Sequence, residues 1–279
     1  MSNSSKKKRT AISVVLAFFT GLFFCGILIS AQVLLGFCST KVLMSSQETS
    51  HYYEKAYEAV KTEIDGAVEA AGLPAGLAEG VITQEGVYMD GANFTKKVMR
   101  GIDAEIDTGE LEDNVRGKIQ AYLTKNKIDT ANADVSSVVD SIAAKAGSVY
   151  KNKVSFAFAE QFYKYTGKLR NAMYIAVAAA AVLTALSAFL LLRMYKHKHR
   201  AMRFFSAGLL GGLLAYAACA VTAWVTQPFG ISVTPQFYMD FIAEFVRESL
   251  EPCIIVFCVG LVLYLASELC TAALKKRRS

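Results

Sequence analysis

Four long apolar stretches alternate with polar segments; the first three are uncharged and the fourth carries one charged residue, Glu268. They cover residues 11–40, 172–192, 204–225 and 253–274. A helix rises about 1.5 Å per residue, so about 20 residues cross the hydrocarbon core of a bilayer, which is about 30 Å thick. Each stretch reaches that length, and the sequence therefore predicts four transmembrane helices.

The first stretch follows a short basic segment, which raises a second interpretation. A basic segment before an apolar run is typical of a secretory signal peptide, and Ile29-Ser30-Ala31 would serve as its cleavage site. The apolar part of a signal peptide is usually about 7 to 15 residues long, whereas this run is about twice that. We therefore expect an uncleaved anchor, with cleavage as the alternative.

Residues 41–171, between the first two predicted spans, carry an amphipathic pattern. Apolar residues recur at spacings of three and four, which predicts helices, and no comparable alternating run argues for a sheet. We expect an all-α integral membrane protein with four transmembrane helices and a helical-bundle extracytoplasmic domain between the first and second. The residues expected to face the core of this domain are Tyr53, Tyr57, Val60, Ile64, Val68 and Ala71 in a first helix, Phe94, Val98, Ile102 and Ile106 in a second, Leu111, Val115, Ile119 and Tyr122 in a third, and Val135, Val138, Val139, Ile142, Ala146 and Val149 in a fourth.

Glycine and proline indicate where these helices end. Gly72-Leu73-Pro74 is expected to stop the first helix, and a glycine-rich connector is expected to run on to about Ala92. On that connector, Tyr88 and Met89 would lie on a mobile loop available to a partner. The fourth helix is expected to continue towards the second span, with Gly167 as the break.

Polar residues indicate where the later helices begin. Asp107, with Glu110 three residues on, is expected to cap the third helix. Asn132 or Asp134 is expected to start the fourth helix.

Residues 226–252 form a second external segment. Pro235 to Glu251 predicts a short amphipathic helix, with aromatic residues such as Tyr238 and Phe241 on one face and acidic residues on the other. Such a helix suits the outer membrane interface, either lying flat or covering the bundle.

The distribution of charge predicts the orientation. The segments 1–10, 193–203 and 275–279 hold 13 of the 30 Lys and Arg residues, and Glu268 is their only acidic neighbour. Short basic loops stay on the cytoplasmic side, so we expect a cell-membrane protein with both termini cytoplasmic. The basic balance then reflects topology and contact with the lipid bilayer, and no nucleic-acid partner is expected.

The six cysteines lie in or beside the predicted spans, and none occurs between Lys41 and Asn171. A disulfide-stapled external domain is therefore excluded, and the cysteines are expected to pack as small apolar residues. This distribution favours a bacterial cell surface.

Small residues repeat along the second and third spans, where they allow helix backbones to approach closely. One interpretation is an oligomer or partner interface, and the other, which we favour, is packing of the second span against the third within one chain. The candidate helix-packing residues are Ala172, Ala176, Ala180, Thr184 and Ala188 in the second span, and Ala207, Gly208, Gly211, Gly212 and Ala215 in the third.

Two ionisable residues are the best candidates for catalysis. His51 is the only histidine in the predicted external segments, so hydrolysis there would depend on it alone. Glu268 is the only ionisable residue well inside a predicted span, but Lys275 follows seven residues later, and we interpret Glu268 as interfacial. We expect no enzymatic activity, no metal site and no cofactor.

The order of one span, an external domain and three further spans resembles, in topology only, the FtsX/MacB-type permeases that work with a cytoplasmic ATPase. That resemblance implies a subunit of a membrane transport system as the alternative function, and no motif residue is carried over. The first expectation is a non-enzymatic multi-pass membrane protein. Its helical ectodomain would sense or bind an envelope component or a partner protein in the membrane or envelope.

Overall fold

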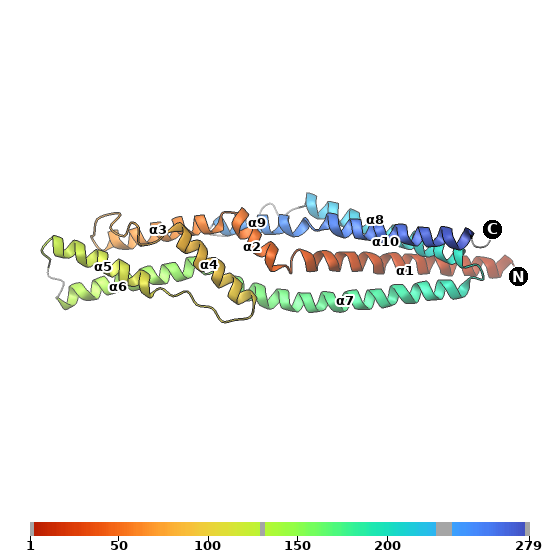
Figure 1. Ribbon diagram of the computed structural model, residues 1–279, viewed down its shortest axis with the longest axis horizontal. Helices are drawn as coiled ribbons and strands as arrows, with labels where there is room; N and C mark the ends of the chain where they lie inside the picture. The colour runs from red at the N-terminus through yellow and green to blue at the C-terminus, as the bar shows by residue number, and fades with distance from the viewer. Residues whose placement is uncertain (1–2, 129–131, 227–235, 277–279) are drawn as a thin grey trace. The chain divides into compact units, whose positions relative to one another are not determined.

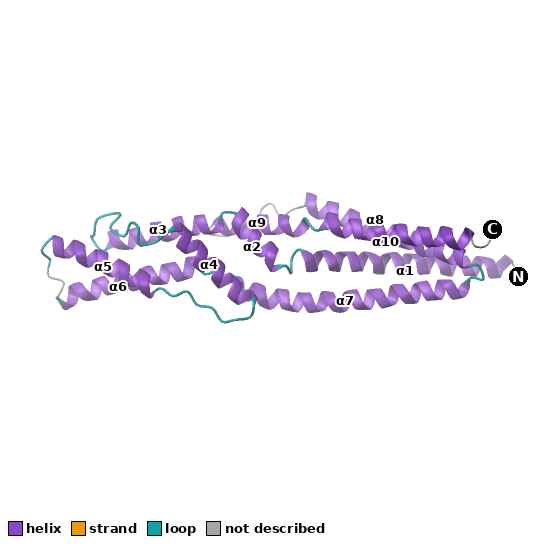
Figure 2. Ribbon diagram, viewed as in Figure 1, coloured by secondary structure: helices purple, strands orange, loops and turns teal. Residues whose placement is uncertain are grey.

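The computed structural model describes residues 3–128, 132–226 and 236–276. Within these ranges the chain is helical and forms no strand (Figure 2). The helices, labelled in Figure 1, are α1 (Asn3–Leu35), α2 (Thr40–Thr49), α3 (Tyr52–Ala70), α4 (Gln84–Met99), α5 (Gly109–Lys125), α6 (Ala133–Val154), α7 (Ala159–Met194), α8 (Lys198–Val225), α9 (Gln236–Leu250) and α10 (Cys253–Lys276).

The expectation of an all-helical chain with four candidate membrane spans is confirmed. By length and composition, α1, α7, α8 and α10 contain stretches that are long and apolar enough to cross a membrane. The chain divides into two compact units, which are described separately. The span unit comprises Met1–Leu43, Thr166–Ile231 and Ala243–Ser279, and the bundle unit comprises Met44–Tyr165 and Ser232–Ile242.

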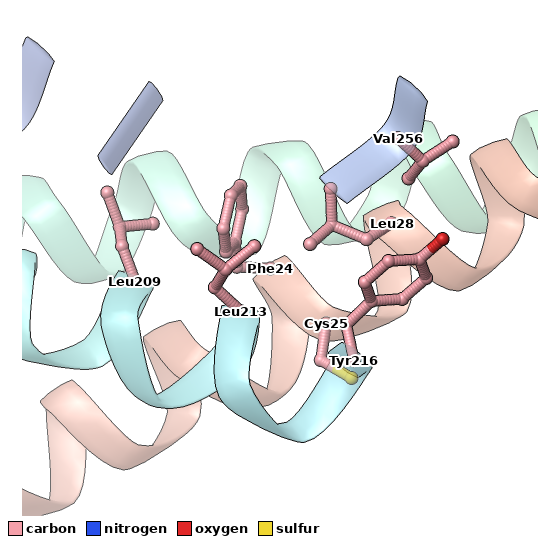
Figure 3. Packing of buried hydrophobic residues seen from close by; sticks show 7 residues of the cluster. All are labelled: Phe24, Cys25, Leu28, Leu209, Leu213, Tyr216 and Val256. Carbon is pink, nitrogen blue, oxygen red and sulfur yellow. The ribbon is translucent and has the colours of Figure 1, made fainter. Parts of the chain in front are cut away.

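The core of the span unit is built by α1, α8 and α10. Helix α8 packs against both α1 and α10. Figure 3 shows their buried side chains interleaving, with Tyr216 reaching towards Leu28 and Val256. The buried cluster consists of Phe24, Cys25 and Leu28 of α1, Leu209, Leu213 and Tyr216 of α8, and Val256 of α10.

Glycines set the distance between α1 and α8. A Cβ atom added to Gly21 would lie 2.7 Å from the carbonyl oxygen of Gly208, and one added to Gly208 would lie 2.5 Å from that of Ala17. A Cβ at Gly212 would meet the backbone of Gly21. The two backbones therefore touch at a point that only glycine allows.

The core of the bundle unit follows the predicted stripes closely. Helix α3 contacts α4 and α6, and α5 packs along α6. Most predicted core positions are buried, but Val138 is 51% exposed, Ile102 is 53% exposed and Ala71 is exposed as well. Leu123, rather than Tyr122, completes the buried face of α5. The buried residues of the predicted stripes are Tyr53, Val60, Ile64, Val68, Val98, Ile106, Leu111, Val115, Ile119, Val139, Ile142, Ala146 and Val149.

The first span is shorter than its uncharged run. Helix α1 ends at Leu35, and a turn at 36–38 leads into α2. Two features enforce this end. A Cβ at Gly36 would overlap the backbone of Ser249, and the Ser39 hydroxyl accepts a hydrogen bond from the Val42 amide at 3.4 Å. A second break separates α2 from α3 at His51, whose φ is 54°.

The prediction that Tyr88 and Met89 lie on a loop is wrong, because these residues belong to helix α4. The helix begins at Gln84, where the Thr83 hydroxyl caps it by accepting a hydrogen bond from the Gly86 amide at 3.1 Å. The glycine-rich connector therefore ends about nine residues earlier than expected. Glycine here serves packing as well, because a Cβ at Gly91 would overlap the ring of Tyr53.

The break before the second span also differs from expectation. Helix α6 ends at Val154, and α7 begins at Ala159 and runs through Gly167 without interruption. Phe156 lies in the connection and is 2% exposed, with its ring centroid 5.7 Å from that of Tyr52. Burial of Phe156 pulls the chain inward, which breaks the helix there rather than at Gly167.

The expected amphipathic helix is α9. Within the bundle unit, its first part packs on Tyr52, whose ring centroid is 5.4 Å from that of Phe237 and 6.0 Å from that of Phe241. These contacts favour the interpretation in which α9 covers the bundle. Glu248 was expected on the polar face, but it is 9% exposed.

Candidate functional site

The bundle unit carries an apolar groove where the C-terminal ends of α3 and α5 meet the N-terminal end of α6. Its volume is about 260 Å³. The lining residues are Ala71, Leu73, Ile119, Leu123, Ile128, Asp134, Val135, Val138, Val139 and Ile142. Asp134 is the only ionisable residue among them.

Two helix ends of the same type build one side of the groove. After α3, the Leu73 amide bonds to the carbonyl oxygen of Val68 at 3.3 Å, with Gly72 at φ 78°. After α5, the Ile128 amide donates a hydrogen bond to the carbonyl oxygen of Leu123 at 3.0 Å, with Lys127 at φ 60°. This Schellman arrangement characteristically turns the following apolar residue back onto its helix.

Helix α6 supplies the other side of the groove. The side chain of Asn132 accepts a hydrogen bond from the Asp134 amide at 2.9 Å, and the helix begins there as expected. Val139 and Ile119 are 3% and 1% exposed and form the floor. Val138 and Ile128 are 51% and 45% exposed and form the rim.

The described residues that line the groove are suited to binding an apolar group, because none of them carries a hydroxyl, thiol, imidazole or amine. Cavities that hold whole drug-sized ligands have volumes of about 300 to 1,000 Å³, so this one suits one or two apolar side chains. An apolar concavity with an exposed rim is typical of an anchor pocket for a partner.

A second notable cluster of the bundle unit is aromatic and structural. Tyr52 is fully buried, and the Tyr53 hydroxyl donates to the side-chain oxygen of Gln47 at 3.1 Å. Burial raises the pKa of Tyr52 and of Tyr53 well above the usual range. Both phenols stay neutral near pH 7, so they supply no acid or base there.

The predicted small-residue stripes do not face each other. In α7, Ala172 and Ala176 are exposed, while Ala180, Thr184 and Ala188 are half-buried. In α8 the stripe divides by position: Ala207, Gly211 and Ala215 are exposed, whereas Gly208 and Gly212 are buried.

The expected packing of these two stripes against each other therefore needs correction. Gly208 and Gly212 pack against α1 instead, because Gly21 gives α1 the matching bare backbone. The alanine and glycine residues that remain exposed are left on the surface of the span unit.

The two candidate catalytic residues lie apart from any cluster. Nδ1 of His51 lies 3.0 Å from Oε2 of Glu54, and both side chains are exposed. Glu268 is an exposed residue of α10. In the described part of the chain, no group of three or more His, Cys, Asp or Glu residues is placed to hold a metal ion.

Sequence reasoning missed the groove residues that follow helix ends. Leu73 and Ile128 lie outside the helical periodicity, so they belong to none of the apolar stripes in the sequence. The signal was present as an apolar residue directly after Gly72, but Lys127 takes the left-handed conformation without being glycine. The periodicity predicts Val138 as a core residue, whereas it lies on the groove rim.

Comparisons with known proteins do not add a family to this description. No protein-family model matches the chain, and neither the curated proteins nor the solved structures give a match. The class that the fold defines is an all-helical chain with four helices suited to crossing a membrane.

Proposed function

We propose that the chain is a non-enzymatic, multi-pass cell-membrane protein whose bundle unit binds an apolar segment of an envelope component or partner protein. The observation that carries the proposal is the apolar groove between α3, α5 and α6. Its rim leaves Val138 and Ile128 exposed on a unit whose other predicted core positions are mostly buried. Exposed apolar side chains around a concavity stabilise a complex by their burial.

The charge pattern supports a location of the bundle unit outside the cytoplasm. Short basic segments flank the four apolar helices at 1–10, 193–203 and 275–279. The positive-inside rule places these segments in the cytoplasm and residues 41–171 on the opposite side. The groove is then available to envelope components, and any signal it generates passes through the membrane to a partner.

Photo-crosslinking of the full-length protein in native membranes tests the proposal. A photoreactive phenylalanine analogue in place of Val138 is expected to give a defined adduct, and the same analogue in place of Ser137 a much weaker one. Ser137 is exposed on the same helix but does not line the groove. The captured component is then identified by mass spectrometry.

Substitutions within the groove separate specific binding from chance proximity. Val138→Asp places a charge at the rim and is expected to lower recovery of the captured component at least tenfold, while Ser137→Asp leaves recovery unchanged. Equal recovery with both variants would contradict the proposal. Recovery of an ATP-hydrolysing subunit, independent of Val138, would support the transport alternative instead.

A further inference from the structure

A second pocket lies in the span unit, where α1 begins and α7 passes into α8. Its volume is about 670 Å³, and Arg9, Arg200 and Arg203 line it together with four other residues. We propose that this pocket binds the phosphate group of an anionic phospholipid. The inference rests on the placement of the four helices in a bilayer and not on the role of the bundle unit. The other lining residues are Thr10, Tyr195, Phe204 and Ala207.

The position of the pocket along the helices matches the level of lipid headgroups. Arg9 and Thr10 directly precede the first uncharged stretch, and Arg203 directly precedes the third. A bilayer that covers both stretches with hydrocarbon leaves these side chains at its polar surface. The position holds for either orientation of the chain. The positive-inside rule selects the cytoplasmic leaflet, which carries anionic lipids.

The pocket carries positive charge that no carboxylate of the described residues neutralises. Across residues 3–128, 132–226 and 236–276, no carboxylate forms an ion pair with any of the three arginines. Three arginines that line one pocket, and that have no carboxylate partner among the described residues, favour the binding of an anion. The planar guanidinium group of an arginine can donate two parallel hydrogen bonds to phosphate oxygens. It therefore matches a phosphate better than the ammonium group of a lysine, which acts as a point charge.

Arg9 is held in place before any ligand arrives. Its guanidinium carbon lies 4.9 Å from the centroid of the Tyr195 ring, and its Nη1 lies 3.5 Å from the carbonyl oxygen of Met194. The Tyr195 hydroxyl is in turn 2.9 Å from the hydroxyl of Ser13. Stacking and hydrogen bonding fix this cation at one wall, which lowers the entropy cost of binding.

The remaining walls suit a lipid rather than a free anion. Phe204 and Ala207 continue the pocket along α8 into the apolar span. A phospholipid presents a phosphate beside a glycerol and acyl chains, so it can contact the arginines and this apolar flank together. A soluble phosphate uses only the arginines.

Native mass spectrometry of the delipidated full-length protein in mild detergent tests the proposal. The probes are phosphatidylglycerol, phosphatidylcholine and inorganic phosphate. We expect phosphatidylglycerol adducts at concentrations at which phosphatidylcholine gives none. Arg9→Gln/Arg200→Gln/Arg203→Gln is expected to weaken phosphatidylglycerol binding at least tenfold.

A matched variant removes equal charge from residues that do not line the pocket. Arg193→Gln/Lys196→Gln/Lys198→Gln is expected to change binding less than threefold. An equal loss in both triple variants would overturn the proposal, because general attraction would then explain binding. Equal binding of both lipids, or displacement of phosphatidylglycerol by millimolar inorganic phosphate, would overturn it as well.

A further pair of variants guards against loss of the fold. Arg200→Gln/Arg203→Gln keeps the contacts of Arg9 with Tyr195 and Met194, and its control is Lys196→Gln/Lys198→Gln. We expect the first pair to weaken phosphatidylglycerol binding several-fold and the control pair to leave it unchanged. A greater loss of phosphatidylglycerol binding in the control pair than in Arg200→Gln/Arg203→Gln would overturn the proposal. Failure here would leave the groove of the bundle unit unaffected, since the two tests probe different units.

Discussion

Single glycines decide which spans touch. Gly208 and Gly211 are both in the small-residue pattern of α8, but only Gly208 and its neighbour Gly212 are buried against α1. The sequence shows that α8 has a small-residue face. It does not show which helix packs against that face. The matching glycine of α1 is Gly21, and it stands in a stretch rich in bulky residues, so no small-residue pattern marks it. The packing of α8 against α1 could therefore not be predicted from the sequence.

The first prediction compares adjacent glycines of α8. Gly212→Ala places a methyl group against the backbone of Gly21 and is expected to destabilise the span unit by about 1 to 3 kcal/mol. Gly211→Ala meets no atom within 4 Å and is expected to be neutral or slightly stabilising. Thermal unfolding of the full-length protein in detergent measures both. Equal melting temperatures for the two variants would show that α1 and α8 do not cross at this point.

The second prediction concerns alkaline pH and the bundle unit. The Tyr150 hydroxyl donates a 2.7 Å hydrogen bond to Oδ2 of Asp90, and burial together with this carboxylate raises the pKa of Tyr150 above its usual value of 10.0. Folding thus favours the neutral phenol. Its contribution to stability is fully present below the unfolded pKa and is lost as pH rises through the folded pKa.

Tyr150→Phe tests this contribution. The variant is expected to be less stable at pH 7, because Asp90 loses a hydrogen bond, but its stability should decline less steeply above about pH 10. The measurement is unfolding of the full-length protein from about pH 8 to about pH 11. Tyr165→Phe, at a 67% exposed position, should follow the parent protein. A parallel decline for Tyr150→Phe would refute the role assigned to its ionisation.

Among the elements, helices were predictable where a stripe runs for three turns or more. The stripes of α3, α5 and α6 arise from local periodicity, which depends only on neighbours along the chain. Helix ends were less predictable, because side-chain caps and tertiary contacts set them. Thr83 starts α4 inside a stretch that looks like a connector, and Ser39 starts α2 inside an apolar run.

The same reasoning explains the break between α6 and α7. Nothing in local propensity distinguishes Phe156 from Phe158, whereas Gly167 is a residue that often interrupts helices. Burial decides the outcome, because Phe156 is 2% exposed and Phe158 is 45% exposed. The candidate groove escaped prediction for a related reason, since it forms only when two helix ends and a third helix come together.

The third prediction uses this pair of phenylalanines. Phe156→Ala is expected to destabilise the bundle unit by about 3 to 5 kcal/mol through the cavity it leaves, and Phe158→Ala by much less. Hydrogen exchange on the full-length protein resolves the effect by segment. Exchange in α3 and α6 should rise with Phe156→Ala, while α1 and α8 stay protected. Uniform loss of protection in all four helices would contradict a separate bundle unit.

At the scale of the whole molecule, charge and hydrophobicity carry more information than any single motif. The four apolar helices agree with the four apolar stretches of the sequence, and the basic segments lie at alternate ends of those stretches. This arrangement favours a chain that crosses a membrane four times with its basic segments on one side. We therefore expect the groove to be accessible from outside the cytoplasm and the arginine pocket from the cytoplasmic side.

The fourth prediction tests this arrangement in intact cells. Ser137→Cys lies on the bundle unit and Lys196→Cys lies between α7 and α8, both at exposed positions. A membrane-impermeant maleimide is expected to label Ser137→Cys in intact cells, and Lys196→Cys only after the membrane is permeabilised. The native cysteines lie in or beside the apolar helices, where a water-soluble reagent has little access, so the parent protein should give a low background. Labelling of Lys196→Cys in intact cells would reverse the orientation and would place the arginine pocket at the outer leaflet.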